Sequence, residues 1–461
     1  MTAIIERLTP HELVEVWPGR RGWPQTIGAL AVVEGAPLRG SDGDVALDRL
    51  LPAVGRVLAW PRFRQVLHEP GPGRGGPVWV DDGDLDLARH VTVVPVPTPG
   101  DDAALLATCA RLYEAPLDPA RPLWRVWVLP GLTDGRVGLL VVLHHALTDG
   151  AGALTAVGAV FDPEPAPPAA PWTTALRPPR PAPTNAELAL DALRRRGHAL
   201  RSIAAAATHP RGVAGAARQS RKALSGYDRH APRTSLNQRV GRRRALHVAR
   251  FDLDAVRAAA HAHATTVNDV LLAALAGGLH ELLAARGELS PGLVLRASVP
   301  VAGPPEPGRT QNARTGMLVR LPVGEDDDER RLAAVVADTQ ERKRQPLDLG
   351  RSGVLSSPLV LRGAVALAAR QRVSNIYLAN LAGPPKPAWL AGARVLELLP
   401  LTNVVGNIGV SVAALSYAGR LAVTVTSDPE LHPDVGVFVH GLERTVERLT
   451  APYWPASSPR P

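Results

Sequence analysis

Cysteine is almost absent from this chain: Cys109 is the only one among 461 residues. A single cysteine excludes an internal disulfide and fits a reducing compartment. No uninterrupted apolar run reaches the length of about 18 residues that a membrane-spanning helix requires, so we expect no such helix. Residues 1–7 lack the basic region and the apolar core of a secretory signal peptide. These absences predict a cytoplasmic protein, either soluble or attached peripherally to a membrane.

The basic residues are unevenly distributed along the chain. The formal net charge is +9, yet residues 194–250 alone contain fifteen Arg or Lys and one acid, Asp228, a local excess of +14. Such a block can contact the phosphates of nucleic acid, of lipid headgroups or of a nucleotide cofactor, or it can be a solvated linker. Tyr227 is its only aromatic residue. Because single-strand binders stack bases on aromatic side chains, no nucleic-acid partner is expected.

Proline divides the chain into two parts of similar size. Residues 163–183 contain nine prolines and predict a linker rather than a helix or strand. Strand and helix patterns alternate on both sides of it, which predicts an α/β protein of two halves. We expect an N-terminal half over residues 1–162, a proline-rich and then basic linker over 163–245, a C-terminal half over 246–449 and a frayed tail over 450–461.

Several local patterns predict particular elements. Asn185 is the expected cap of a helix, and Thr265 or Thr266 caps a second, apolar one. A strand is predicted around residues 393–400. The run Gly71–Gly76 matches a dinucleotide-binding pattern, but it contains a proline and leads into an extended segment where that site needs a helix. A hairpin loop is predicted there instead.

The residues best suited to a catalytic site lie at positions 141–150. The apolar run of residues 141–143 predicts a buried strand that ends in His144 and His145, and Asp149 and Gly150 follow. Adjacent residues of a strand point to opposite faces, so we expect one histidine to face a cavity while the other supports it. From these residues alone a catalytic base and a pair of packed histidines beside an Asp-Gly turn both remain open.

Two other kinds of site are not expected. Adjacent histidines cannot share a metal ion, and the pair His261 and His263 lacks carboxylate or cysteine ligands at the usual spacing. No Ser or Cys lies in a nucleophile motif, since Gly350–Gly353 departs from G-x-S-x-G. The sequence therefore predicts neither a metal site nor a covalent acyl-enzyme.

The spacing His-His-x-x-x-Asp-Gly after a hydrophobic strand resembles the active-site signature of the CoA-dependent acyltransferase superfamily. Further segments resemble, in the same order, those of bacterial wax ester synthase/diacylglycerol acyltransferases: residues 61–65, 77–80, 84–87, 116–124, 266–273, 295–301, 380–384 and 415–421. The resemblance covers about residues 8–449. It implies two chloramphenicol-acetyltransferase-like halves that form a pseudo-dimer, with the active site in a channel between them.

The resemblance also implies roles for the residues of the motif. His145 would be the general base that removes the hydroxyl proton of an alcohol, and His144 would support it. Asp149 would hold the loop through an ion pair, with Arg296 as the first candidate cation and Arg309 as the second. Gly150 would allow the substrate to approach the end of the strand closely.

Other matching positions are expected to line or support the channel. Trp124 is a candidate buried anchor, and Asn268 and Asp269 start a helix against the channel. Asn380, next to a Gly-Pro turn, could be structural or catalytic. The chain departs from the usual family pattern at Pro304, where an arginine is common, and at Met317, where asparagine is usual. Both departures concern the range of acceptors.

The expected activity is O-acyl transfer from acyl-CoA, a co-substrate, with no permanently bound cofactor. The acceptor would be a long-chain alcohol, giving a wax ester, or a diacylglycerol, giving a triacylglycerol. Two alternatives stay open: the same chemistry on a small polar acceptor, and a non-catalytic lipid-binding protein. The basic residues 194–250 would contact the phosphates of CoA or the surface of the inner membrane or of lipid droplets.

Overall fold

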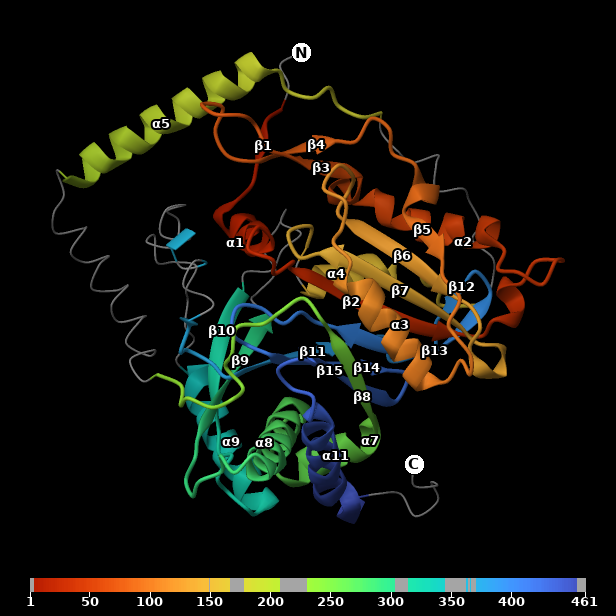
Figure 1. Cartoon of the computed structure of the whole chain (residues 1–461), viewed down its shortest axis with the longest axis vertical. Coiled ribbons are helices and arrows are strands. Elements are labelled where there is room, and N and C mark those ends of the chain that lie inside the picture. The colour runs from red at the N-terminus through yellow and green to blue at the C-terminus, as the bar shows by residue number, and fades with distance from the viewer. Residues whose placement is uncertain are drawn as a thin grey trace.

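The computed structural model describes residues 4–148, 150–165, 178–207, 230–302, 314–344, 362–363, 365 and 370–453. These residues form two sheet-rich halves that lie against each other, the N-terminal half above the C-terminal half in the view of Figure 1. Helices and strands alternate in both halves, so the predicted mixed α/β architecture is confirmed.

The N-terminal half is built on a six-stranded sheet with the order β12-β13-β2-β7-β6-β5. Its strands are β2 (Thr26–Val33), β5 (Val91–Val93), β6 (Trp124–Leu129), β7 (Val137–His144), β12 (Trp389–Leu390) and β13 (Ala393–Leu401). The helices of this half are α1 (Pro10–Gly19), α2 (Leu47–Val54), α3 (Asp102–Glu114) and α4 (Gly150–Gly158). A separate small sheet contains β1 (Glu6–Arg7), β3 (Gln65–His68) and β4 (Val78–Asp81). Strands β3 and β4 pair antiparallel, which confirms the hairpin predicted around Gly71–Gly76.

Strand β7 lies in the interior of its sheet, antiparallel to β2 on one side and to β6 on the other. Its residues 137–143 are all buried, and only His144 at its end is partly exposed. A strand covered on both faces needs apolar side chains at every position rather than at alternate ones. This explains the continuous apolar run of the sequence and confirms the predicted buried strand.

The C-terminal half is built on a second six-stranded sheet with the order β10-β9-β11-β14-β15-β8. Its strands are β8 (Ala245–Asp252), β9 (Leu295–Ala302), β10 (Arg314–Leu321), β11 (Ile376–Ala382), β14 (Val410–Tyr417) and β15 (Arg420–Ser427). Its helices are α7 (Leu253–Ala262), α8 (Val267–Ala285), α9 (Asp328–Arg344) and α11 (Val435–Thr450). They gather on the lower face of this sheet in Figure 1, away from the N-terminal half.

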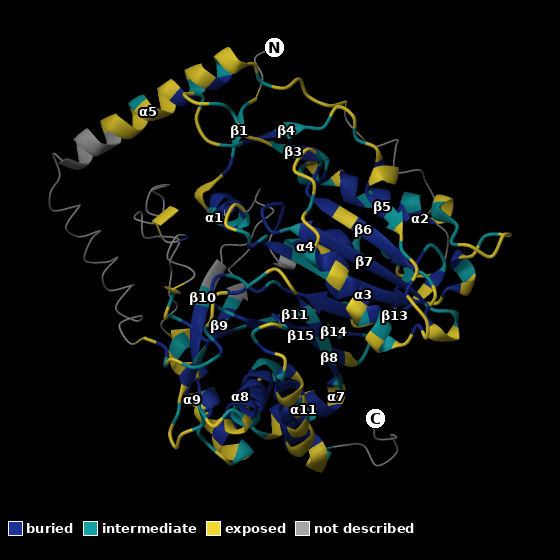
Figure 2. Ribbon diagram, in the orientation of Figure 1, coloured by how far each residue is buried: buried dark blue, intermediate teal, exposed yellow. Residues whose placement is uncertain are grey.

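Among the described helices, α8 alone is long and apolar enough to cross a membrane by length and composition. However, 72% of its apolar window is buried inside the protein, and Figure 2 shows it dark blue between its neighbours. Two glycines make the close packing against α11 possible, since a Cβ on Gly277 would clash with Thr445 and one on Gly278 with Phe438. The helix is therefore apolar all round because it is the central helix of a protein core.

The C-terminal part of the sequence contributes strands to the N-terminal sheet, and we call β13 the exchanged strand. β12 and β13 lie far into the C-terminal part of the sequence, yet β13 pairs antiparallel with β2 of the N-terminal sheet. The predicted domain boundaries place residues 389–401 in the C-terminal half, whereas in the structure their strands belong to the N-terminal sheet. A sequence pattern shows that residues 393–400 are extended, but it does not show which edge strand they will join.

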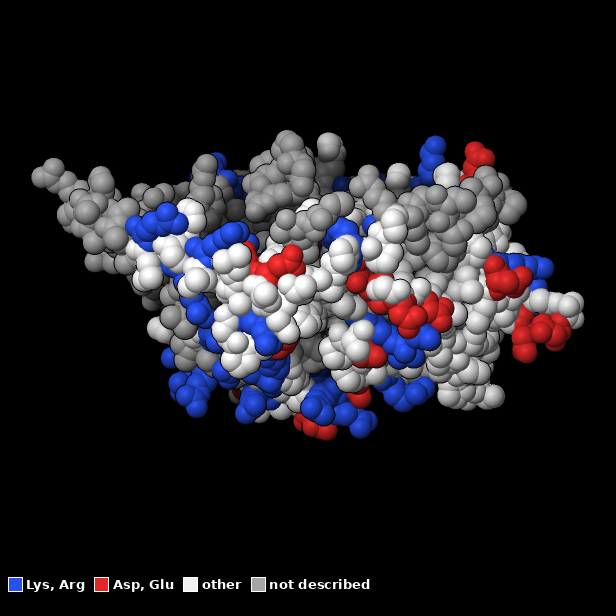
Figure 3. Space-filling view, turned by 90° about the horizontal axis from the view of Figure 1, so that it is seen from above, with Lys and Arg blue, Asp and Glu red and all other residues white. Residues whose placement is uncertain are grey.

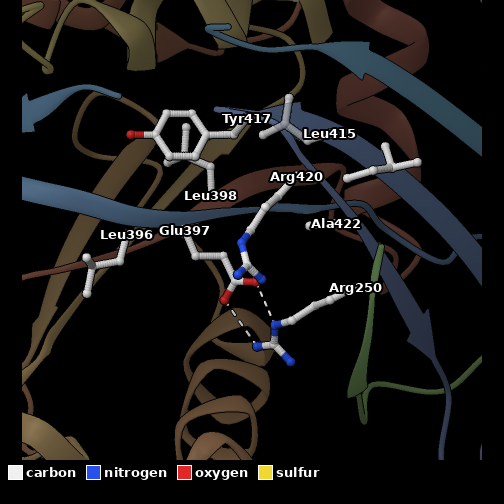
Figure 4. A pocket seen from close by; sticks show the side chains of 9 residues that line it. Arg250, Leu396, Glu397, Leu398, Leu415, Tyr417, Arg420 and Ala422 are labelled. Atoms are coloured by element: carbon white, nitrogen blue, oxygen red, sulfur yellow. Dashed lines mark hydrogen bonds and ion pairs between the residues drawn. The ribbon is translucent and has the colours of Figure 1, made fainter. Parts of the chain in front are cut away.

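The seam between the halves combines apolar packing with an ion-pair cluster. One hydrophobic core contains Leu30 and Trp127 of the N-terminal sheet together with Leu246 and Ala422 of the C-terminal sheet. The Arg250 guanidinium on β8 binds Glu397 of β13 at 2.6 Å and Asp102 of α3 at 2.7 Å. Figure 4 shows Arg250 paired with Glu397 among the residues that line a small pocket on this seam.

Helix α5 (Asn185–Ala207) leaves the rest of the protein and extends along one side, as Figure 1 shows. Its cap is Thr184, whose hydroxyl accepts the Glu187 N–H at 3.3 Å while the Glu187 carboxylate accepts the Thr184 N–H at 2.8 Å. The predicted cap, Asn185, is therefore off by one residue. Threonine followed three residues later by glutamate is a capping box, and that pair was the better signal.

Candidate active site

The sequence motif lies where strand β7 ends and helix α4 begins. His144 is the last residue of β7, in register with Thr26 of β2, and Gly150 is the first residue of α4. His145 lies in the turn between them, which is closed by a hydrogen bond from the Leu147 N–H to the His144 carbonyl at 2.9 Å. The expectation that both histidines lie on the strand is therefore wrong for His145. Its direction is set by a turn and not by strand alternation.

His144 is held as a neutral imidazole. Its Nδ1 accepts a hydrogen bond from the Ala146 N–H at 3.1 Å, so the ring proton of the neutral form is on Nε2. The pKa of His144 is lowered to about 4, chiefly by burial and to a smaller extent by the neighbouring His145, although the Glu15 carboxylate on α1 partly opposes both. A histidine with that pKa carries no charge near neutral pH. These contacts favour the supporting role expected for His144.

The main chain of His145 is anchored by the residue that directly precedes β2. Its N–H donates to the Gln25 carbonyl at 2.7 Å, directly before β2 begins. Gln25 is itself buried, and its side chain donates from Nε2 to the Trp23 carbonyl at 3.1 Å. The Gln25 Oε1 accepts a hydrogen bond from Asn403 at 2.8 Å. Asn403 follows β13, so the exchanged strand reaches the turn that carries His145.

Two further contacts fix the same segment. Trp23 is buried and donates from its indole nitrogen to the Val240 carbonyl at 3.2 Å, which ties it to the end of the linker. The Tyr113 hydroxyl of α3 donates to the Thr26 carbonyl at 2.5 Å. Burial raises the pKa of the Tyr113 hydroxyl, so it stays a donor. Residues 23–26 are thus held by the linker, by α3 and by the exchanged strand.

Gln25, Asn403 and Tyr113 were not among the candidates from the sequence. Gln25 and Asn403 are 378 positions apart, and neither belongs to a motif. The one local signal was Pro24, directly before Gln25, because proline favours a turn. That signal indicates a turn but gives no partner.

Trp124 lies beside the motif as a buried anchor. It is on β6, opposite Leu143, and its indole nitrogen donates to the Phe63 carbonyl at 2.9 Å. The His90 ring stacks on it with a centroid distance of 4.2 Å. These contacts satisfy its polar atom and cover one face of the ring, so the geometry favours the structural role.

Asp269 accepts hydrogen bonds at the start of α8 and from the neighbouring helix α9. Its carboxylate accepts from the Thr266 hydroxyl at 2.6 Å and from the Thr339 hydroxyl of α9 at 2.8 Å. Thr266 is therefore the cap, one of the two residues predicted. Asn268, one position earlier, is partly buried. The hydrogen bonds of Asp269 favour support of the helix start over a catalytic role.

Arg296 and Asn380 lie in the C-terminal sheet. Arg296 is on β9, and its backbone N–H donates to the Asn375 side chain at 3.0 Å. Asn380 is partly buried on β11, in register with Ala414. Asp149 and Arg309 lie outside the described residues, so the ion pair of Asp149 with Arg296 or Arg309 stays a prediction.

Of the two departures from the family pattern, Met317 lies among the described residues. Met317 lies on β10 opposite Val299 and packs in the C-terminal core. Pro304 lies outside the described residues.

Over the described part of the chain, no group of three or more His, Cys, Asp or Glu is arranged to hold a metal ion.

Comparison with known proteins covers both halves. Residues 8–271 match the wax ester synthase/diacylglycerol acyltransferase catalytic domain, and residues 310–450 match the WS/DGAT C-terminal domain. The chain belongs to the wax ester synthase/diacylglycerol acyltransferase family. This confirms the resemblance inferred from the motif, and with it the expectation of an O-acyltransferase enzyme that acts on alcohol acceptors.

Relatives and solved structures agree over nearly the whole chain. A probable diacylglycerol O-acyltransferase of Mycobacterium tuberculosis is 31% identical over 92% of this chain and 91% of its own length. The wax ester synthase/diacylglycerol acyltransferase from Marinobacter aquaeolei VT8 superposes with a TM-score of 0.70 at 23% identity, covering 97% and 99% of the two chains. The starter condensation domain of rhizomide synthetase, in complex with C8-CoA and Leu-SNAC, superposes at 0.62 with 14% identity, covering 97% and 94%. The shared fold confirms the predicted pair of chloramphenicol-acetyltransferase-like halves.

Proposed function

We propose that this family member transfers a fatty acyl group from acyl-CoA to a long-chain alcohol or to diacylglycerol, with His145 as the general base. The observation that carries the proposal is the place of His145, in a turn at the end of a buried central strand whose backbone is fixed by Gln25. A base that is held by the main chain on both sides has little freedom to leave a productive orientation.

The reaction needs one proton acceptor that later returns its proton. The His145 imidazole removes the proton of the acceptor hydroxyl as the oxygen attacks the thioester carbonyl carbon. The tetrahedral intermediate then collapses, the carbon–sulfur bond breaks, and the imidazolium gives the proton to the leaving thiolate of CoA. No group of the protein is acylated, and no permanently bound cofactor takes part.

His144 supports this role through the turn. Its Nδ1 holds the Ala146 N–H, so the peptide that follows His145 is fixed as firmly as the one before it. Asp149 would steady the other end of the loop through its ion pair, and Gly150 would leave space for the substrate at the start of α4.

The supporting test compares thiol release from acyl-CoA by wild type, His145→Ala and His440→Ala. His440 is an exposed histidine on α11 and serves as the matched control. Loss of the base should lower kcat by about 10²- to 10⁴-fold, and His440→Ala should leave it unchanged. If His145→Ala retains wild-type kcat with every alcohol tested, His145 is not the base.

A panel of acceptors separates the remaining alternatives. Thiol release with hexadecanol or dioleoylglycerol supports the proposed acceptor class, whereas release only with small polar alcohols supports the alternative in specialised metabolism. Wild-type protein that binds acyl-CoA but releases no thiol with any acceptor would be a non-catalytic lipid-binding protein.

The proposed partners include a lipid surface at the inner membrane face or on lipid droplets, because the acceptors are poorly soluble in water. Not all of the basic residues 194–250 are available for it. Arg250 is paired with two carboxylates, and Arg244 is buried and bonded to the Gly241 carbonyl. Arg243 pairs with Glu114 at 3.6 Å. Among the described residues of the block, four exposed arginines lie on α5, namely Arg194, Arg195, Arg196 and Arg201. Four more lie outside it, namely Arg233, Arg239, Arg242 and Arg243.

A further inference from the structure

Helix α5 exposes large apolar side chains to solvent. Leu190, Leu193 and Leu200 are 48%, 65% and 68% exposed, a high value for leucine. Figure 2 shows the helix exposed along most of its length. A cluster of exposed leucines on one element marks an interaction surface more often than chance exposure, which scatters single residues.

The three leucines lie on one side of the helix. At about 100° per residue they fall within an arc of about 80°. Leu188 and Ala192 are buried against the protein, and they lie on the other side, about 135° from the centre of the leucine arc. Arg7 fastens that inner side through its pair with Asp191 at 2.7 Å. The leucine stripe therefore points away from the protein to which the helix is attached.

Arginines border the stripe on both sides. Arg194 and Arg201 lie about 20–40° beyond Leu190, and Arg196 lies about 40° beyond Leu200. All three side chains are exposed. The only acid among residues 188–201 is Asp191, which is on the inner side and already paired with Arg7 and Arg195. Seen from above, basic side chains also predominate on the left of the molecule, the side on which α5 lies (Figure 3).

We propose that α5 is the docking helix for an anionic lipid surface, with Leu190, Leu193 and Leu200 inserted between the headgroups. A helix with an apolar stripe bordered by arginines lies in the plane of such a surface, because the stripe enters the acyl boundary while the guanidinium groups remain at the phosphates. The proposal rests on the proposed function in one respect only, that the acceptor is a lipid.

The charge pattern favours a lipid surface over a second copy of the chain. Two α5 stripes placed face to face would bring Arg194, Arg196 and Arg201 of both copies together, with no acid on the facing arcs to offset them. Like charges in that arrangement oppose association. Phosphates of anionic lipids supply the complementary charge.

The test is sedimentation of the full-length protein with sucrose-loaded vesicles in the absence of substrates. Wild type should bind vesicles of phosphatidylglycerol and phosphatidylcholine and bind phosphatidylcholine alone at least tenfold less well. The variant Leu190→Gln/Leu193→Gln/Leu200→Gln should lose about 100-fold in affinity for the mixed vesicles. The variant Arg194→Gln/Arg196→Gln/Arg201→Gln should lose about 30-fold and most of its salt dependence. Val437→Gln, at a 38% exposed position on α11, is the control and should bind as wild type.

Two measurements keep this result separate from the reaction. Thiol release with a water-soluble short-chain alcohol should be unchanged in both α5 variants, whereas release with dioleoylglycerol in vesicles should fall with their binding. Equal vesicle binding by wild type and the leucine variant would overturn the proposal. A wild-type dimer in light scattering that the leucine variant converts to monomer, without vesicle binding by either, would also overturn it and assign the stripe to a second copy.

Discussion

The hydrogen bond between Asn403 and Gln25 predicts that a residue following the exchanged strand controls the rate of acyl transfer. The informative change is Asn403→Leu, which keeps the branching at Cγ and removes the donor. The Gln25 Oε1 then lies buried without its 2.8 Å partner, beside the carbonyl that holds the His145 N–H. Leaving a buried acceptor unpaired costs about 1–3 kcal/mol.

That cost can be relieved if Gln25 moves, and such movement displaces the turn of His145. A misplacement of about 1 Å in a catalytic group can lower a rate by about 100-fold. We therefore expect kcat to fall between about fivefold and 100-fold, with KM for acyl-CoA changed less than about twofold, since acyl-CoA binding does not depend on the base. The assay is thiol release at saturating acceptor, run alongside thermal denaturation.

The chain offers a matched control for this prediction. Gln371 and Asn407 form another glutamine–asparagine hydrogen bond at 2.8 Å in the C-terminal half, and no described bond of theirs reaches the His145 turn. Asn407→Leu should therefore lower the melting temperature without lowering kcat. If Asn403→Leu loses stability to a similar degree and keeps wild-type kcat, the bond to Gln25 is structural only and the reasoning fails.

Three further predictions follow from the contacts of single side chains. His144→Asn should keep at least a third of wild-type kcat, because its amide oxygen can replace Nδ1 as the acceptor for the Ala146 N–H. His144→Leu should lower kcat about tenfold or more, and equal losses in the two variants would mean that this bond does not matter. Arg250→Met should lower the free energy of unfolding by about 2 kcal/mol because Glu397 and Asp102 lose their shared cation, against about 0.5 kcal/mol or less for Arg257→Met on α7, whose pair is exposed. The pKa values of His144 and His432 are both lowered to about 4, chiefly by burial, so the unfolded state binds more protons than the folded state between pH 6.5 and 4. The free energy of unfolding should therefore fall as the pH is lowered through that window, and urea titrations should show a shallower fall for His432→Gln than for wild type.

The sequence predicted those parts of the protein that depend on neighbouring residues. Residues 141–143 predicted a buried strand because every position is apolar, and β7 is buried on both faces. Thr266 and Asp269 are three residues apart, the spacing of a helix cap, and they form one. The family resemblance rested on many such short segments in order, so it survived errors of one or two residues at element boundaries.

What the sequence could not predict depends on contacts between distant segments. The prediction that His145 lies on the strand was wrong because the strand ends one residue earlier. The turn that redirects His145 is closed by a main-chain hydrogen bond to His144, which no side-chain pattern indicates. The exchange of β13 into the N-terminal sheet is equally hidden, since an apolar strand fits several sheet edges and only the tertiary fold selects one.

The exchanged strand gives a physical reason why neither half should work alone. The N-terminal half contributes His144 at the end of β7 and His145 in the turn that follows, but the segment that anchors His145 is completed by Asn403, two residues after β13. Because β13 also packs against β14 and β15, any opening of the seam that pulls β13 away from β2 would disturb the Gln25 side chain before it reaches the turn that carries His145. The ion pairs of Arg250 with Glu397 of β13 and Asp102 of α3 resist that opening at the other end of the strand. The orientation of His145, the proposed base, and the cohesion of the two halves therefore both depend on β13 and the residues that follow it.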